Sequence, residues 1–457
     1  MRERIGAFLG RGRKDSSPPV PGEQREAPAS RVLRRTLAAL QAVNDPAISD
    51  VEGGRRAAEV AAWYASAGAE ERRAFWLLLC ERFAPDIGAL DAARAAYEAA
   101  SGTPGEARAE VALRKALTPP RTRLLQRFAA FPGGLRFLIG LRAELLPLVK
   151  SDARLLALEA ELEGLFSAWF DVGLLELRRI SWNSPAALVE KLIEYEAVHG
   201  IRSWTDAKNR LDEDRRCYGF FHPGLPGEPL IFVEVALLAG MGAGIVPLLD
   251  ETAAAVDLKK ATTAIFYSIN STQRGLNGVS FGDSLIKRVV EILQEEFPRL
   301  KTFATLSPMP GLRTWVTRHA VELSASLSAR QRQALASDLG IKGELGAPQL
   351  LAALDGVAQL TERAALARWL LRAAARYLGA TQGDAGRPVD AVARFHLGNG
   401  ARVERLNWLA DPSPKGLRQS WGLMVNYLYD PKRLDKHRAM LARGKIPLSG
   451  AVENLQD

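Results

Sequence analysis

The chain has 457 residues, 47% of them hydrophobic and 25% charged, which is typical of a globular protein with room for two domains. The net charge of +9 comes from Lys and Arg spread among acidic residues, without the dense basic stripe of a nucleic-acid binder. The two cysteines and five histidines form no HExxH pattern and no His/Cys cluster, which argues against a metal site and favours a reducing compartment.

Residues 1–30 are basic and then rich in Pro, Ser and Glu, and we expect a disordered tail. No apolar segment in this tail is long enough for secretion, and its acidic residues disfavour organelle targeting. We therefore expect a cytoplasmic protein. The apolar stretch 230–249 contains Glu234, several glycines and Pro247, which favours a buried strand and a loop over a membrane span.

Residues 31–177 show helical periodicity throughout, with Pro and Gly at the joints. We expect a helical domain that serves as a scaffold or in oligomerisation, because no cluster of reactive residues occurs in it. The predicted helices are 31–43, 53–68, 69–83, 88–101, 105–117, 120–130, 133–149 and 151–178.

From residue 178 to 457 the pattern changes to mixed helix and strand, because β-branched and aromatic residues concentrate in short runs. Residues 312–380 return to amphipathic helix, and we interpret them as a helical insertion in this second domain. The predicted strands are 215–221, 229–238, 262–269, 302–307, 402–408 and 421–429.

The stretch from Thr263 to Pro310 is the most informative part of the chain. An apolar run is followed by a Gly-rich loop (270–283), an amphipathic helix (284–297), a second apolar run and then Ser-Pro-Met-Pro. Free backbone N–H groups and the helix dipole favour an anion at such a loop. The loop has neither the Walker A pattern nor the Rossmann spacing, so phosphate binding and a plain glycine turn both remain open from spacing alone.

Several long blocks of the chain resemble the malonyl-CoA decarboxylase family. They include AIFYSINSTQRGLNGVSFGDSLIKRVVEILQEEFP, TLSPMPG, FHLGNGARVERLNWLADPSPKGL and GLMVNYLYDP. The resemblance covers about 178–430 closely and the helical part more loosely. It implies an α+β protein, with an all-helical N-terminal domain followed by a mixed-sheet catalytic domain of the GCN5-related acetyltransferase type. It also implies conversion of malonyl-CoA to acetyl-CoA and CO2 without metal or organic cofactor, by a homodimer or homotetramer.

The resemblance carries the family's coenzyme-binding loop and catalytic residues onto this sequence. Ser307 and His396 match the catalytic serine and histidine, and Tyr429 matches a supporting tyrosine near the site. We expect Ser307 to orient the carboxylate or the thioester oxygen, and His396, with a pKa near working pH, to protonate the enolate carbon. The coenzyme-binding loop corresponds to Asn277, Gly278, Val279, Ser280, Phe281, Gly282 and Asp283.

Two other functions remain open from the residues. An acyltransferase on the same fold would use the same loop but needs an acceptor site, which no motif indicates. A non-catalytic, coenzyme A-binding assembly protein would need only the loop and the helical domain. The presence of both Ser307 and His396 in matching contexts favours the decarboxylase.

Overall fold

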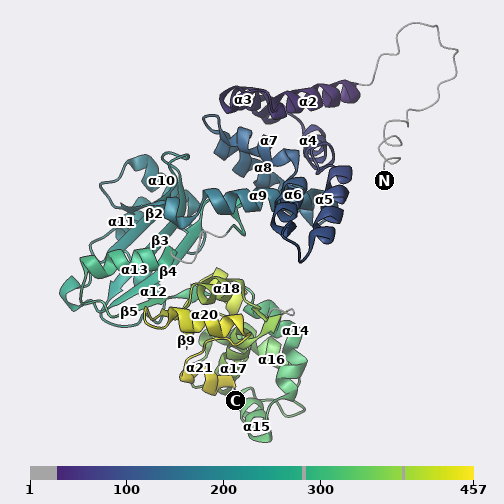
Figure 1. The fold of residues 1–457 in the computed structure, drawn as a ribbon. Helices are drawn as coiled ribbons and strands as arrows, with labels where there is room; N and C mark the ends of the chain where they lie inside the picture. The colour runs from purple at the N-terminus through teal and green to yellow at the C-terminus, as the bar shows by residue number, and fades with distance from the viewer. Residues whose placement is uncertain (1–27, 280–284, 383–385, 457) are drawn as a thin grey trace, which may run out of the picture. The chain divides into compact units, whose positions relative to one another are not determined.

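The computed structural model describes residues 28–279, 285–382 and 386–456, which fold into two compact units (Figure 1). The first unit runs to Trp169 and also contains the segment Gln273–Val279. The second comprises Phe170–Thr272 and the described residues from 285 onward. The order of the elements confirms the expected fold class, a helical part followed by a mixed-sheet part.

The first unit consists of helices around an aromatic core. Tyr64, Phe75, Phe128 and Phe137 pack edge-on or stacked, with ring centroids 5.2–6.4 Å apart. Such pairs contribute beyond the area that they bury. Its elements are α2 (Pro28–Asn44), α3 (Asp50–Ser66), α4 (Ala69–Arg82), α5 (Ile87–Ala100), α6 (Glu106–Leu117), α7 (Pro120–Ala129), α8 (Gly134–Val149), η1 (Ala153–Leu155), α9 (Leu156–Trp169) and η4 (Arg274–Leu276).

The predicted helix 151–178 is wrong at both ends. Asp152, whose carboxylate accepts the Arg154 N–H at 3.2 Å, starts a short 3-10 turn, and α9 ends at Trp169. The 3-10 turn η2 (Val172–Leu174) and strand β1 (Glu176–Ile180) follow. β1 pairs with β2 in antiparallel register, with Leu177 opposite Phe220 and Ile180 opposite Cys217.

The second unit is built on a mixed sheet, with strand order β1-β2-β3-β4-β5-β10-β6 and β9 paired to β10. All neighbours in it are antiparallel except β4 and β5, which are parallel and joined by α13. The strands are β2 (Arg215–Phe221), β3 (Pro229–Leu238), β4 (Thr263–Ser271), β5 (Thr302–Thr305), β6 (Ser307–Pro308), β9 (Arg402–Asn407) and β10 (Met424–Tyr429), and the pair β7 (Thr381–Gln382) and β8 (Arg387–Pro388) lies apart.

The second unit also contains helices, and those between Leu312 and Gly379 lie within the range 312–380 that we interpret as a helical insertion. They are α10 (Ala186–Tyr195), α11 (Trp204–Arg210), α12 (Val246–Leu249), η3 (Leu258–Lys260), α13 (Leu285–Glu296), α14 (Leu312–Ala325), α15 (Ala329–Asp338), α16 (Ala347–Ala353), η5 (Leu354–Gln359), α17 (Ala365–Gly379), α18 (Ala391–Gly398), α19 (Pro414–Ser420), α20 (Leu434–Ala442) and α21 (Gly450–Gln456). In the described part of the chain, no helix has the length and hydropathy to span a membrane.

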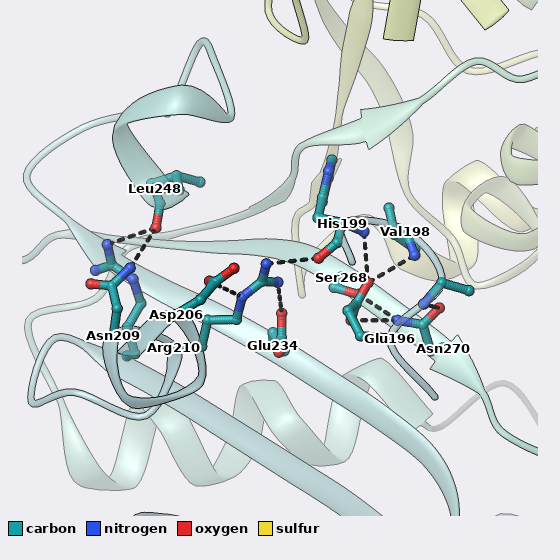
Figure 2. Close-up of polar contacts among 12 residues, drawn as sticks. Glu196, Val198, His199, Asp206, Asn209, Arg210, Glu234, Leu248, Ser268 and Asn270 are labelled. Atoms are coloured by element: carbon teal, nitrogen blue, oxygen red, sulfur yellow. Dashed lines mark hydrogen bonds and ion pairs between the residues drawn. The ribbon is translucent and has the colours of Figure 1, made fainter. Parts of the chain in front are cut away.

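A buried polar network fastens the α10–α11 connection to the sheet (Figure 2). The Arg210 guanidinium donates to Asp206 at 2.9 Å, to Glu234 of β3 at 3.2 Å and to the His199 carbonyl at 2.7 Å. Beside it, the Glu196 carboxylate accepts from Ser268 and Asn270 of β4, each at 2.6 Å. Burial raises the pKa of the Glu234 carboxyl to about 8, because the charged form would lose its hydration.

Candidate active site

Three elements of the second unit bring Ser307, His396 and Tyr429 together. β10 pairs with both β5 and β6, with Tyr429 opposite Phe303 and Val425 opposite Ser307. His396 comes from α18, near the helix's C-terminal end. Sequence positions 89 residues apart are thereby joined, because the Ser307 Oγ lies 3.1 Å from the His396 Nε2.

The other ring nitrogen of His396 is also engaged. Its Nδ1 lies 2.8 Å from the hydroxyl oxygen of Tyr429. The three residues form a continuous chain from serine hydroxyl through imidazole to phenol, and each is at most 5% exposed. This is the arrangement of a nucleophile, a base and an orienting group, except that a phenol stands where hydrolases have a carboxylate.

The electrostatic state of His396 differs from the expectation of a pKa near working pH. Burial lowers its pKa to about 3, because the protonated ring would lose its hydration. The ring of Tyr427 stacks on the imidazole with centroids 4.6 Å apart, which adds to its desolvation. His396 is therefore neutral in the unliganded protein, and the expectation from sequence was wrong on this point.

The phenol of Tyr429 is likewise uncharged. Burial raises its pKa well above the ordinary value for tyrosine. A neutral phenol can donate to Nδ1, which leaves the proton of the neutral imidazole on Nε2 facing Ser307, or it can accept from Nδ1–H. Tyr429 thus contributes to the choice of which nitrogen carries the proton.

Two residues that sequence reasoning did not select complete the site. The Ser307 hydroxyl donates to the Thr305 Oγ1 at 2.8 Å, and the Tyr427 N–H donates to the same oxygen at 3.2 Å. Thr305 precedes Ser307 by two positions, and Tyr427 precedes Tyr429 by two. Strand periodicity puts such pairs on one face, so this signal was available in the sequence.

The start of α18 explains how His396 is presented. Asp390 caps the helix by accepting the Ala393 N–H at 2.7 Å and also accepts the Tyr377 hydroxyl at 2.7 Å. An Asp at this position satisfies an N–H group that the helix leaves without a partner. Gly400 follows the helix with φ +86, a conformation that favours glycine, and turns the chain toward β9.

The predicted coenzyme-binding loop is described only in part. Asn277, Gly278 and Val279 follow η4, whereas Ser280, Phe281, Gly282 and Asp283 lie outside the described residues. Within the helical unit, the buried Arg142 of α8 donates to the carbonyls of Gly275 at 2.7 Å and Asn277 at 2.9 Å.

The approach of this segment to α8 is close enough to require glycine. A Cβ at residue 275 would lie 1.9 Å from the Ile139 carbonyl oxygen. The carbonyl contacts of Arg142 and the absence of a side chain at Gly275 together fix the entry to the loop.

Comparison with known proteins decides the family. The model of the malonyl-CoA decarboxylase C-terminal domain matches residues 173–457, and that of the N-terminal domain matches residues 83–170. The chain belongs to the malonyl-CoA decarboxylase family. This places it among the carboxy-lyases.

Individual relatives agree with this membership. The mitochondrial malonyl-CoA decarboxylase of Anser anser anser is 35% identical over 443 residues, covering 93% of this chain and 88% of that protein. The malonyl-CoA decarboxylase structure from Rhodopseudomonas palustris superimposes with a TM-score of 0.80 at 40% identity, covering 92% of this chain and 99% of that one. The malonyl-CoA decarboxylase structure from Cupriavidus metallidurans superimposes with a TM-score of 0.75 at 42% identity, covering 93% of this chain and 100% of that one.

The described site offers one hydroxyl donor, Ser307, beside one titratable ring, His396. It also offers groups that hold these two residues in place: Thr305, Tyr427, Tyr429 and Asp390. In the described parts of the chain, no three His, Cys, Asp or Glu side chains cluster so that they could hold a metal ion.

Proposed function

We propose that this chain releases CO2 from malonyl-CoA through a thioester enolate, with Ser307 orienting the substrate and His396 delivering the proton. Malonyl-CoA decarboxylation is the activity of the family to which the chain belongs. The observation that carries the assignment of residues is the 3.1 Å contact between the Ser307 Oγ and the His396 Nε2. Two groups from distant parts of the chain are held at hydrogen-bond distance in a buried site, as acid–base chemistry requires.

The reaction asks the protein mainly for orientation and charge stabilisation. When the bond between the α-carbon and the carboxylate breaks, its electron pair moves into the thioester and makes an enolate, while the carboxylate leaves as CO2. The thioester is itself the electron sink, so we propose that no metal or organic cofactor takes part. Ser307 would hydrogen-bond the carboxylate or the thioester oxygen and keep the breaking bond perpendicular to the thioester plane.

The neutral state of His396 refines its role as proton donor. The titratable groups that face its ring are the phenols of Tyr427 and Tyr429, and Asp390, at the start of its helix, is hydrogen-bonded to Tyr377. The malonyl carboxylate would therefore bring the negative charge that raises the pKa of His396. Once CO2 has left, the imidazolium loses this partner, becomes a strong acid in a buried site and gives its proton to the α-carbon of the enolate.

We propose that the segment 277–283 binds the diphosphate of coenzyme A. The support for this is the loop's glycine content and its place before α13, where backbone N–H groups and the helix dipole favour an anion. Arg142 would fix the described part of the loop through the carbonyls of Gly275 and Asn277.

We also propose a cytoplasmic homodimer or homotetramer. The two cysteines, Cys80 and Cys217, are free thiols, which suits a reducing compartment. Helices α5 and α6 have no buried residue, and they expose Ile87, Val111 and Leu117. Exposed apolar side chains on neighbouring helices are typical of a surface that a second subunit covers. Light scattering of the purified protein tests the assembly, and a monomer would refute it.

The test of the reaction is an assay with malonyl-CoA as the only substrate. We expect CO2 and acetyl-CoA to form without any acceptor. Turnover only after an amine is added would indicate an acyltransferase, and binding without turnover would indicate an assembly protein. In D2O, the acetyl group should carry one deuterium, because the proton of the enolate step comes from an exchangeable site.

A further inference from the structure

We propose that Thr305 is a positioning residue for the reaction, whose hydroxyl sets the direction in which Ser307 donates its proton. The inference rests on the proposed function of Ser307. Thr305 is fully buried at the end of β5, and the proposed reaction gives it no direct contact with the substrate. Its hydroxyl is nevertheless the second polar neighbour of Ser307, at 2.8 Å, besides the imidazole of His396 at 3.1 Å.

The strand is interrupted where Thr305 lies. Ala304 pairs with Leu428, and Ser307 pairs with Val425, but the backbone between them leaves the ladder with β10. Side chains close the gap, because the Tyr427 N–H donates to the Thr305 Oγ1 at 3.2 Å and the Asn426 amide donates to the Thr305 carbonyl at 2.7 Å. Thr305 is thus fixed by its backbone and by its hydroxyl.

Thr305 influences which groups donate in this series of hydrogen bonds, because the number of protons available is limited. A serine hydroxyl has one proton to donate, and a neutral imidazole also has one N–H. When Ser307 donates to Thr305, the His396 Nε2 can carry the imidazole proton and donate it to Ser307, while Tyr429 donates to Nδ1. If the Thr305 hydroxyl were absent, Ser307 would have only Nε2 as an acceptor within this chain, which would favour the opposite arrangement with the proton on Nδ1.

Substrate binding can reverse the direction of the hydrogen bond between the two hydroxyls by rotation alone, because neither covalent O–H bond has to break. Ser307 rotates about its Cβ–Oγ bond and donates to the substrate oxygen. The Thr305 hydroxyl also rotates and donates to the Ser307 Oγ, whose own proton now points to the substrate. The Thr305 Oγ1 continues to accept the Tyr427 N–H. A donor that itself accepts a hydrogen bond is polarised and donates more strongly. Thr305 therefore strengthens the contact that Ser307 makes with the reacting group.

Thr305→Val tests this proposal, because valine keeps the branched shape and removes the hydroxyl. We expect kcat for malonyl-CoA to fall about 10-fold to 100-fold, the loss typical of misdirected groups in a site, with KM nearly unchanged. Thr305→Ser retains the hydroxyl and should restore most of the rate. The proposal is overturned if Thr305→Val has the wild-type kcat, or if Thr305→Ser is as slow as Thr305→Val. Should Thr305→Val fail to fold, Thr305→Ala replaces it as the variant without a hydroxyl.

A double-mutant cycle separates positioning from a merely structural role. If Thr305 acts through Ser307, then Thr305→Val added to Ser307→Ala should cause no further loss of single-turnover rate. Losses that multiply would show that Thr305 acts independently, and would overturn the inference. The failure of the proposed function looks different, because Ser307→Ala alone would then keep its full rate.

Discussion

At the scale of single residues, the neutral state of His396 has a consequence for stability. The unfolded chain exposes the imidazole, whose ordinary pKa is 6.5, whereas burial lowers the pKa in the folded protein to about 3. Between these values the unfolded state binds one proton more than the folded state does. The free energy of unfolding must therefore decrease as pH falls through this window and be regained as pH rises.

The variant His396→Asn removes this contribution. We expect the free energy of unfolding to depend less steeply on pH in the variant between pH 7 and 5, by up to about 1.4 kcal/mol per pH unit at the lower end. Urea unfolding at several pH values measures the two slopes. Equal slopes in variant and wild type would mean that His396 titrates normally in the folded protein.

The sequence anticipated part of this residue-scale picture. The sequence around Ser307, His396 and Tyr429 resembles the family's site, and the structure brings these three residues together. The charge state of His396 could not be predicted, since it depends on the stacked ring of Tyr427 and on burial by elements distant in sequence. Thr305 was overlooked although its spacing from Ser307 on a strand was visible.

At the scale of elements, α18 depends on one residue for its start. Asp390 both caps the helix and accepts the Tyr377 hydroxyl, and its own pKa is raised by burial. Replacement by Ala should cost about 0.5–2 kcal/mol for the lost cap, with a further cost for the unpaired Tyr377 hydroxyl. Because α18 presents His396, kcat should fall as well.

Asp390→Asn is the matched control, since the amide oxygen can still accept from the Ala393 N–H. We expect this variant to lie close to the wild type in melting temperature and kcat, and Asp390→Ala to lie below it in both. Thermal unfolding and steady-state kinetics give the comparison. If Asp390→Ala melts like the wild type and keeps its kcat, neither the cap nor the Tyr377 contact supports the site.

Elements with a long periodic pattern of apolar residues are easier to predict than short strands or strands at the edge of the sheet. The bounds of α13 and of strands β2 and β3 follow from long apolar patterns. The sequence of β1, Glu-Leu-Arg-Arg-Ile, favours a helix because it contains good helix formers, and only its pairing with β2 makes it a strand. The break between β5 and β6 could not be foreseen either, since it depends on side chains of β10.

At the scale of the whole molecule, the segment Gln273–Val279 leaves the sheet and belongs by its contacts to the helical unit. If this segment helps to bind coenzyme A, a substitution in the helical unit that disturbs the segment should weaken the affinity for malonyl-CoA. Arg142→Met removes the two carbonyl contacts and a 2.6 Å ion pair with Glu159. We expect KM for malonyl-CoA to rise about tenfold, which corresponds to 1.4 kcal/mol of lost binding, with kcat largely kept.

Arg127→Met is the control for a general loss of stability. Arg127 is also buried in the helical unit and donates to backbone carbonyls, those of Val43 at 2.5 Å and Asp45 at 2.8 Å. It should destabilise the unit and leave KM unchanged. An equal rise of KM in both variants would attribute the effect to weakened folding and not to the loop.

The most direct test of the account compares Ser307→Ala and His396→Asn with the wild type, using malonyl-CoA turnover and acetyl-CoA binding as paired readouts. The account predicts that each variant loses about 100-fold or more in turnover, the usual contribution of a positioned acid or base. It predicts that both still bind acetyl-CoA with nearly wild-type affinity, because that ligand lacks the carboxylate. Wild-type turnover in either variant, or loss of acetyl-CoA binding in step with turnover, would contradict it.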